Sequence, residues 1–177
     1  MNEPPNSSNS QADTDGIGRI MIFAMWGIIL LGLFLFFSGA LETRTNPNQR
    51  LETMSENGRQ TVVLQRNAFG HYVAPGTVNG QPVEFFLDTG ATRVSIPERV
   101  ANRLGLEKGA IQYSGTANGT IQVYDTVLDS ISLGGIKLTN IRASINPHMD
   151  SDDILLGMSF LKFLDFSQQG EELTLTY

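Results

Sequence analysis

The tripeptide Asp88-Thr89-Gly90 is the segment of this sequence best suited to chemistry. It follows the apolar run 83–87, so a buried strand would deliver a carboxylate into a tight turn. A carboxylate held there, with little water and with backbone N–H groups nearby, can act as an acid or a base in hydrolysis. The motif occurs once, because 125–127 and 129–131 lack the glycine. If two such carboxylates must cooperate, the second has to come from another copy of the chain.

Composition excludes several other kinds of chemistry. The chain has no cysteine, which rules out thiol nucleophiles and Cys-based zinc sites, and its two histidines, His71 and His148, are isolated. No metal site is therefore expected. No phosphate-binding glycine motif follows a predicted strand, so no nucleotide cofactor is expected either. The net charge of −6 divides into −2 for 1–19, 0 for 42–60 and −4 for 61–177, so nucleic acid is not an expected partner.

An apolar segment from Ile20 to Leu41 has no charged side chain and predicts a transmembrane helix. As a helix it would extend roughly 33 Å, enough to cross a hydrocarbon core of about 30 Å. A cleaved signal peptide is the alternative, because Ser38-Gly39-Ala40 resembles a cleavage site. The segment is longer than a typical signal core of about 7–15 residues and follows an acidic stretch, so a retained single-pass anchor in a lipid bilayer is favoured.

The regions on either side of this segment predict a tail and a tether. Residues 1–19 are polar and rich in Ser, Asn and Pro, which favours a disordered tail. Residues 42–60 mix both charge signs and have no sustained hydrophobic period, which suits a flexible tether. The membrane orientation stays open, because one arginine precedes the apolar segment and three follow it, while long domains translocate largely regardless of such biases.

Residues 61–177 have the pattern of a small, mostly β domain. Asn-Gly dipeptides at 79–80 and 118–119 each lie between two apolar runs and predict hairpins. Pro97 before a short amphipathic run and Gly105 after it predict a helix of about two turns. The expected strands are 61–64, 71–78, 83–87, 111–116, 120–127, 130–133, 137–145, 154–156 and 173–177, with a second short helix at 158–163.

Three segments together resemble the retropepsin-like aspartic proteases of clan AA. Phe85-Phe86-Leu87-Asp88-Thr89-Gly90-Ala91-Thr92 is similar to their catalytic strand and turn, Thr116-Ala117-Asn118-Gly119-Thr120 falls where their flap hairpin lies, and Ile154-Leu155-Leu156-Gly157 resembles the strand behind the catalytic turn. With its apolar N-terminal segment, the chain is similar to the bacterial single-domain, membrane-anchored type. The resemblance covers about residues 61–177 and implies an all-β, small closed β-barrel-like domain with one or two short helices.

The resemblance implies an aspartic endopeptidase that is active only as a homodimer. Both catalytic carboxylates would be Asp88, and two such groups about 3 Å apart share one proton and activate a water, with peak activity below neutral pH. The family further implies that Thr89 hydroxyls hydrogen-bond across the two-fold axis, that Gly90 lets substrate approach, and that Ala91-Thr92 continues the turn. The strand 173–177 is the expected dimer contact, since terminal strands interleave in family members.

The expected partners are a second copy of the chain, a peptide or protein substrate and the bilayer, and the expected location is the bacterial inner membrane with the domain in the periplasm. Two other interpretations stay open. A non-catalytic, membrane-tethered module could capture extended peptides by strand addition, although such a binder has no use for an acid at this turn. A single-chain hydrolase could pair Asp88 with Asp125 or Asp165, although neither lies in a comparable strand and turn.

Three other features have weaker functional signals. Tyr113 is expected either to line the substrate groove or to pack as a strand aromatic. The acidic loop 150–153 is expected to be solvated rather than to hold a cation, because its spacing matches no calcium loop. The segment 154–157 is expected to support the catalytic turn by close packing.

Overall fold

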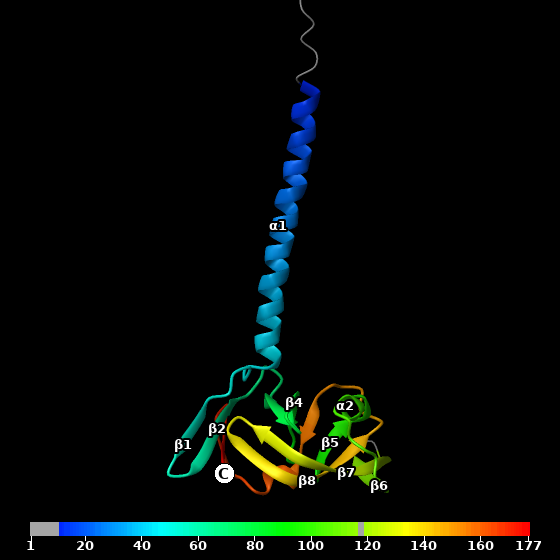
Figure 1. Cartoon of the computed structure of the whole chain (residues 1–177). Coiled ribbons are helices and arrows are strands. Elements are labelled where there is room, and N and C mark those ends of the chain that lie inside the picture. Colours follow the sequence, from blue (N-terminus) through cyan, green and yellow to red (C-terminus); the bar gives the residue numbers. More distant parts are fainter. Residues whose placement is uncertain (1–10, 117–118) are drawn as a thin grey trace, which may run out of the picture. The chain divides into compact units, whose positions relative to one another are not determined.

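The computed structural model describes residues 11–116 and 119–177, with side chains described from residue 18 onward except at 40–43 and 117–118. The chain forms two compact units, one ending at Glu42 and one from Thr43 to Tyr177 (Figure 1). The second unit is mostly β-strand with two short helices, as expected. The elements in chain order are α1 (Gln11–Thr45), β1 (Thr53–Glu56), β2 (Arg59–Gln65), β3 (Val73–Val78), β4 (Gln81–Leu87), β5 (Val94–Pro97), α2 (Glu98–Arg103), β6 (Ile111–Thr116), β7 (Gly119–Leu133), β8 (Ile136–Asn146), β9 (Ile154–Leu156), α3 (Met158–Leu161), β10 (Asp165–Gln169) and β11 (Glu172–Thr176).

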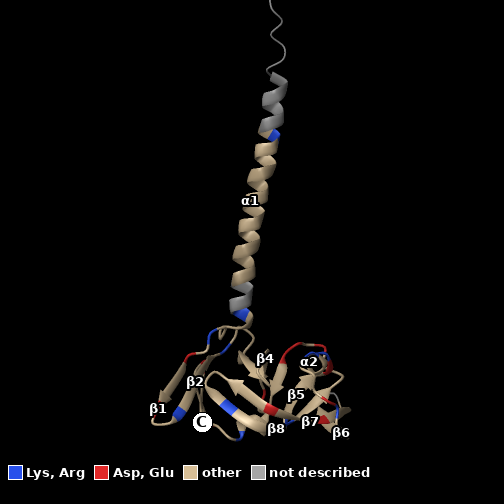
Figure 2. Ribbon diagram, in the orientation of Figure 1, with Lys and Arg blue, Asp and Glu red and all other residues tan. Residues whose placement is uncertain are grey.

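Helix α1 contains one apolar segment, Gly18–Gly39, whose 22 residues and mean hydropathy of 2.7 are sufficient to cross a membrane. Figure 2 shows this segment without charged residues beyond its first turn. None of it is buried in the structure, so it is not a core helix, and a membrane span and a signal sequence both fit it. Residues 11–19, expected in a disordered tail, continue α1 instead, because an established helix extends by one hydrogen bond per added residue. Residues 1–10 lie outside the described residues.

The residues after α1 fold onto the β unit, which corrects the flexible tether expected at 42–60. The buried side-chain amide of Asn48 donates hydrogen bonds to the carbonyl oxygens of Gln65 and Val73, each at 2.8 Å. Its oxygen accepts from the N–H of Gln65 at 2.7 Å. Residues 53–60 then form β1 and the start of β2. These contacts are polar and join segments far apart in sequence. Because no apolar pattern marks them, the composition of 42–60 alone is typical of a linker.

Four strands form an antiparallel sheet in the order β1-β2-β11-β10. Strand β11 pairs with β2 on one side and with β10 on the other, so both of its edges are occupied within one chain. The strand 173–177 therefore offers no unpaired backbone edge within this chain, and its expected role as the dimer contact stays a prediction. The outer strands of this sheet are β1 and β10, and all residues of β10 are exposed.

The second sheet carries the candidate site. Its seven strands run in the order β3-β4-β9-β5-β8-β7-β6, and a further pairing of β3 with β7 closes the sheet into a barrel-like ring with β6 outside it. Asn79 and Gly80 join β3 to β4 with φ angles of 51° and 78°, both positive as a type I′ turn requires, which confirms the expected hairpin. Strand β7 is continuous from Gly119 to Leu133, whereas two separate strands were expected there.

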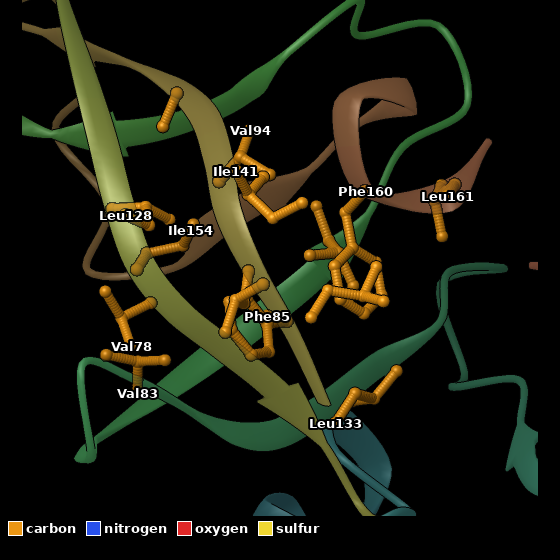
Figure 3. Packing of buried hydrophobic residues seen from close by; sticks show 14 of the residues in the cluster. Val78, Val83, Phe85, Val94, Leu128, Leu133, Ile141, Ile154, Phe160 and Leu161 are labelled. Atoms are coloured by element: carbon orange, nitrogen blue, oxygen red, sulfur yellow. The ribbon is translucent and has the colours of Figure 1, made fainter. Parts of the chain in front are cut away.

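Buried apolar side chains fill the interior of the ring. Figure 3 shows Phe85 of β4 among side chains that include Leu128 of β7, Ile154 of β9 and Phe160 of α3, and all four are fully buried. Burial of each such side chain contributes about 1.5–3 kcal/mol to folding. The interior therefore fixes the end of β4, from which Asp88 emerges.

Tyr72 carries a buried hydroxyl with no hydrogen-bond partner among the described residues, and its ring packs against the core. Replacing Tyr72 with Phe removes this unpaired polar group and keeps the ring. The free energy of unfolding is therefore expected to stay the same or to rise by up to about 1 kcal/mol. Chemical denaturation of both proteins measures the difference, and a clear loss of stability would mean that the hydroxyl is hydrogen-bonded in solution.

Candidate active site

Asp88 is positioned by two parallel strands. Strand β4 ends at Leu87, which lies opposite Leu156 of β9 in the parallel pairing of these strands. The N–H of Asp88 continues this pairing and donates to the carbonyl oxygen of Leu156 at 3.3 Å. The Asp88 side chain is neither fully buried nor fully exposed. The buried strand thus ends in a carboxylate that solvent or a ligand can reach.

The turn after β4 folds back on its own carboxylate. Asp88 Oδ1 accepts a hydrogen bond from the N–H of Gly90 at 2.8 Å, and the N–H of Ala91 donates to the Asp88 carbonyl oxygen at 3.2 Å. The first bond orients the carboxylate, and the second closes the backbone turn. Thr89 and Thr92 are exposed.

The segment 154–157 packs directly behind this turn. Ile154 and Leu156 are fully buried, whereas Leu155 lines the cleft described below. A Cβ atom on Gly157 would lie 2.3 Å from the carbonyl oxygen of Arg93 and 2.6 Å from that of Ala91, so only glycine fits there without movement of the turn. The next N–H, that of Met158, donates to the Ala91 carbonyl oxygen at 2.8 Å.

A hairpin of β6 and β7 borders the site on the other side. The two strands pair from Ile111 opposite Tyr124 up to Thr116 opposite Gly119. The hydroxyl of Thr116 donates to the carbonyl oxygen of Gly119 at 2.8 Å. Of the expected flap residues, Ala117 and Asn118 lie outside the described residues. Gly119 and Thr120 are exposed at the end of the hairpin.

Between the turn and the hairpin lies a cleft of about 680 Å³. Asp88, Gly90, Ala91 and Thr92 line it from the turn, and Thr116 lines it from the hairpin. Thr89, Gly119 and Thr120 are not among its lining residues.

Tyr113 of β6 also lines the cleft and is 75% exposed. This exposure favours the groove over the packed interior, the two alternatives left open for this residue. An aromatic ring that is exposed beside a cleft offers apolar surface to a bound chain.

Arg93 is a cleft residue that sequence reasoning missed. It is the one cation among the described residues that line the cleft, and its guanidinium forms an ion pair with Asp125 of β7. The other oxygen of Asp125 accepts from Gln112 Nε2 of β6 at 3.4 Å, so one carboxylate connects the turn to the base of the hairpin. No local sequence motif indicates these contacts, because Gln112 and Arg93 lie 13 and 32 positions from Asp125 in the sequence.

The two aspartates considered as partners for Asp88 within one chain do not share its cleft. Asp125 pairs with Arg93, and Asp165 begins the exposed strand β10 opposite Thr176. Neither is among the residues that line the cleft. Among the described residues that line this cleft, Asp88 is therefore the one carboxylate.

The acidic loop 150–153 also lies apart from the cleft lining. Asp152 pairs with Arg99 at 2.8 Å. Partial burial of Asp153, and next the charge of Asp152, raise the pKa of Asp153 above its usual value. Among the residues with described placement, no group of three His, Cys, Asp or Glu side chains is arranged to hold a metal ion.

A closed β domain in which a buried strand ends in an Asp-Thr-Gly turn, facing a cleft bordered by a hairpin, has the architecture of the retropepsin-like aspartic proteases. Comparisons with known proteins agree. Residues 74–163 match the family model described as gag-polyprotein putative aspartyl protease. The crystal structure of a retropepsin-like aspartic protease from Rickettsia conorii is similar with a TM-score of 0.55 and 26% identity, covering 72% of this chain and 95% of that one.

Two relatives from bacteria extend the similarity over most of the chain. An uncharacterized protein of a Sinorhizobium species is 30% identical over 163 residues, which are 87% of this chain and 70% of that protein. An uncharacterized protein of Rickettsia prowazekii (strain Madrid E) is 26% identical with the same coverage. The chain belongs to the retropepsin-like aspartic protease family.

Proposed function

We propose that this protein is a membrane-anchored aspartic endopeptidase that hydrolyses peptide bonds as a homodimer. The observation that carries the proposal is the Asp88 carboxylate, which leaves a buried strand and lines a cleft of about 680 Å³ bordered by the β6–β7 hairpin. No other carboxylate belongs to the described lining of this cleft, so a second acid has to come from another copy of the chain.

In the proposed reaction the two Asp88 carboxylates meet at a two-fold axis and hold one proton between them, since like charges so close cannot both ionise. The ionised carboxylate takes a proton from a water molecule, whose oxygen attacks the carbonyl carbon of the peptide bond. The protonated one gives its proton to the carbonyl oxygen. When the tetrahedral intermediate collapses, the C–N bond breaks and the amine nitrogen leaves with the proton that the dyad took from water. A hydroxyl of the intermediate returns its proton to the other carboxylate as the C=O bond of the acid product forms, so one shared proton is restored.

Other residues have supporting roles in this proposal. Thr89, exposed on the turn, would hydrogen-bond to its counterpart across the axis and hold the two turns together. The N–H of Gly90 already orients the carboxylate. The hairpin from Thr116 to Thr120 would close over the bound peptide and exclude water, while 154–157 keeps the turn in place.

The apolar segment of α1 is proposed to be a retained anchor in the bacterial inner membrane, with the β unit on the periplasmic side. Its 22 residues are long enough for a single span. Anchoring two copies in one membrane raises their effective concentration, which favours the dimer without any new contact. Dimer formation would then control activity.

A non-catalytic peptide-binding module is the alternative, and one observation favours it. Strand β6 is the outermost strand of its sheet and lies beside the cleft, so an extended peptide could pair with its open edge. Both functions use the same groove. They differ in whether a bound peptide is cut, which depends on Asp88.

The dimer proposal predicts that cleavage depends on protein concentration. When the full chain is diluted in detergent at a constant ratio of detergent to protein, the rate per chain is expected to fall once the concentration drops below the dimer dissociation constant. A continuous peptide-cleavage assay and analytical ultracentrifugation at the same concentrations measure both quantities. A chemically crosslinked dimer is the control, because its rate per chain should not change. A chain that sediments as a monomer and keeps its full rate would contradict the dimer.

A further inference from the structure

A second hollow, of about 420 Å³, lies beside the catalytic turn. Its lining includes Thr92, Arg93, Arg142, Lys162 and Phe163. We call it the basic pocket, because three of its described lining residues are cationic and no described lining residue is Asp or Glu. Thr92 and Arg93 line the catalytic cleft as well, so the two hollows adjoin at the end of the turn.

Two cations of the basic pocket are available to a ligand. Arg93 is paired with Asp125, but the side chains of Arg142 and Lys162 form no ion pair or hydrogen bond with any residue that the structure describes. Both side chains belong to exposed residues, and Lys162 Nζ lies over the Phe163 ring at 5.0 Å from its centroid. The chain as a whole has a net charge of −6, so this hollow differs in sign from the protein as a whole.

We propose that the basic pocket binds acidic side chains of the peptide substrate that flank the scissile bond. The inference rests on the proposed function. A peptide that lies extended in the cleft and continues past Thr92 and Arg93 reaches the basic pocket. An Asp or Glu side chain at that point meets Arg142, whose planar guanidinium matches a carboxylate, and Lys162, a mobile point charge.

The symmetry of the proposed dimer extends the preference to both sides of the scissile bond. A two-fold axis between the two Asp88 residues repeats the basic pocket at the opposite end of the joined cleft. One substrate chain can therefore meet one basic pocket on each flank. Each exposed ion pair is expected to improve binding roughly 1.5- to 5-fold, so one pair on each flank together gives about 2- to 25-fold.

The test uses two cleavable peptides that differ only in carrying Glu or Gln at the positions flanking the scissile bond. The full-length wild-type protein is expected to cleave the Glu peptide with a kcat/KM about tenfold higher than that of the Gln peptide. The difference should lie in a lower KM. Added salt should reduce this preference, because it screens exposed charges. Replacing both Arg142→Gln and Lys162→Gln is expected to remove most of the preference while cleavage of the Gln peptide stays near the wild-type rate.

Lys137→Gln is the matched control, because Lys137 is an exposed cation on the same strand as Arg142 and does not line the pocket. Its preference should equal that of the wild type. Binding of the labelled peptides to the full-length Asp88→Asn protein, followed by fluorescence anisotropy, tests the same preference without cleavage. Equal affinity for the two peptides, or a preference that survives in the double variant, would overturn the inference. A preference in binding without cleavage by the wild type would count against the proposed function instead.

Discussion

Replacing Asp88 with Asn is expected to lower kcat for peptide cleavage by about four orders of magnitude or more, because the amide can neither take a proton from water nor share one with its counterpart. The fold should survive, since an amide oxygen can still accept the hydrogen bond that Asp88 Oδ1 accepts from Gly90. Steady-state cleavage of a peptide library substrate measures the rate, and circular dichroism checks the fold.

Asp129→Asn is the matched control for this change. Asp129 is an exposed aspartate of β7 that does not line the cleft, so the same loss of charge there should leave kcat near the wild-type value. If purified Asp88→Asn protein cleaves at the wild-type rate, the catalytic role of this carboxylate is wrong. If it binds peptides that the wild type also binds without cutting, the binding-module alternative is favoured.

Replacing Gly157 with Ala is expected to cost about 1–3 kcal/mol of folding free energy or more, and to reduce cleavage strongly. The added methyl group would lie 2.3 Å from the Arg93 carbonyl oxygen, and both contacts it meets are backbone atoms of the turn that follows Asp88. Gly157 has φ of −90°, which alanine tolerates, so the cost comes from the collision alone. Thermal unfolding and the peptide assay measure the two effects.

Gly115→Ala separates this collision from a general effect of removing a glycine. A Cβ atom on Gly115 would have no atom within 4 Å, and its backbone is not in the left-handed region. Its unfolding temperature should therefore stay close to that of the wild type. Equal stability of the two variants would show that the turn moves freely and that Gly157 is not a rigid support.

The parts of the fold that could be predicted from sequence are those with a hydrophobic pattern or strict turn chemistry. Strand β9 (Ile154–Leu156) has the predicted bounds, because its apolar run is short and ends at a glycine. The hairpin at Asn79-Gly80 was predicted because two positive φ angles suit this dipeptide. The turn at Asp88 was predicted for the same kind of reason, since polar turn residues follow an apolar strand.

The missed elements have no such pattern. Strand β10 is exposed along its whole length, so backbone pairing with β11 forms it and no alternation of apolar residues marks it. Strand β1 is likewise largely exposed and pairs with β2. The basic pocket joins Arg93, Arg142 and Lys162, which come from separate elements. Only the three-dimensional arrangement brings such residues together.

The most direct test of the central claim mixes wild-type chains with Asp88→Asn chains. Subunits are exchanged at a fixed total concentration, and the cleavage rate is measured as the fraction of wild-type chains changes. If each active site needs Asp88 from both copies, mixed dimers are inactive, and an equal mixture should have about one quarter of the rate of wild-type protein alone. A rate that falls in simple proportion to the wild-type fraction, to about one half at equal amounts, would mean that each chain acts alone and would contradict the account.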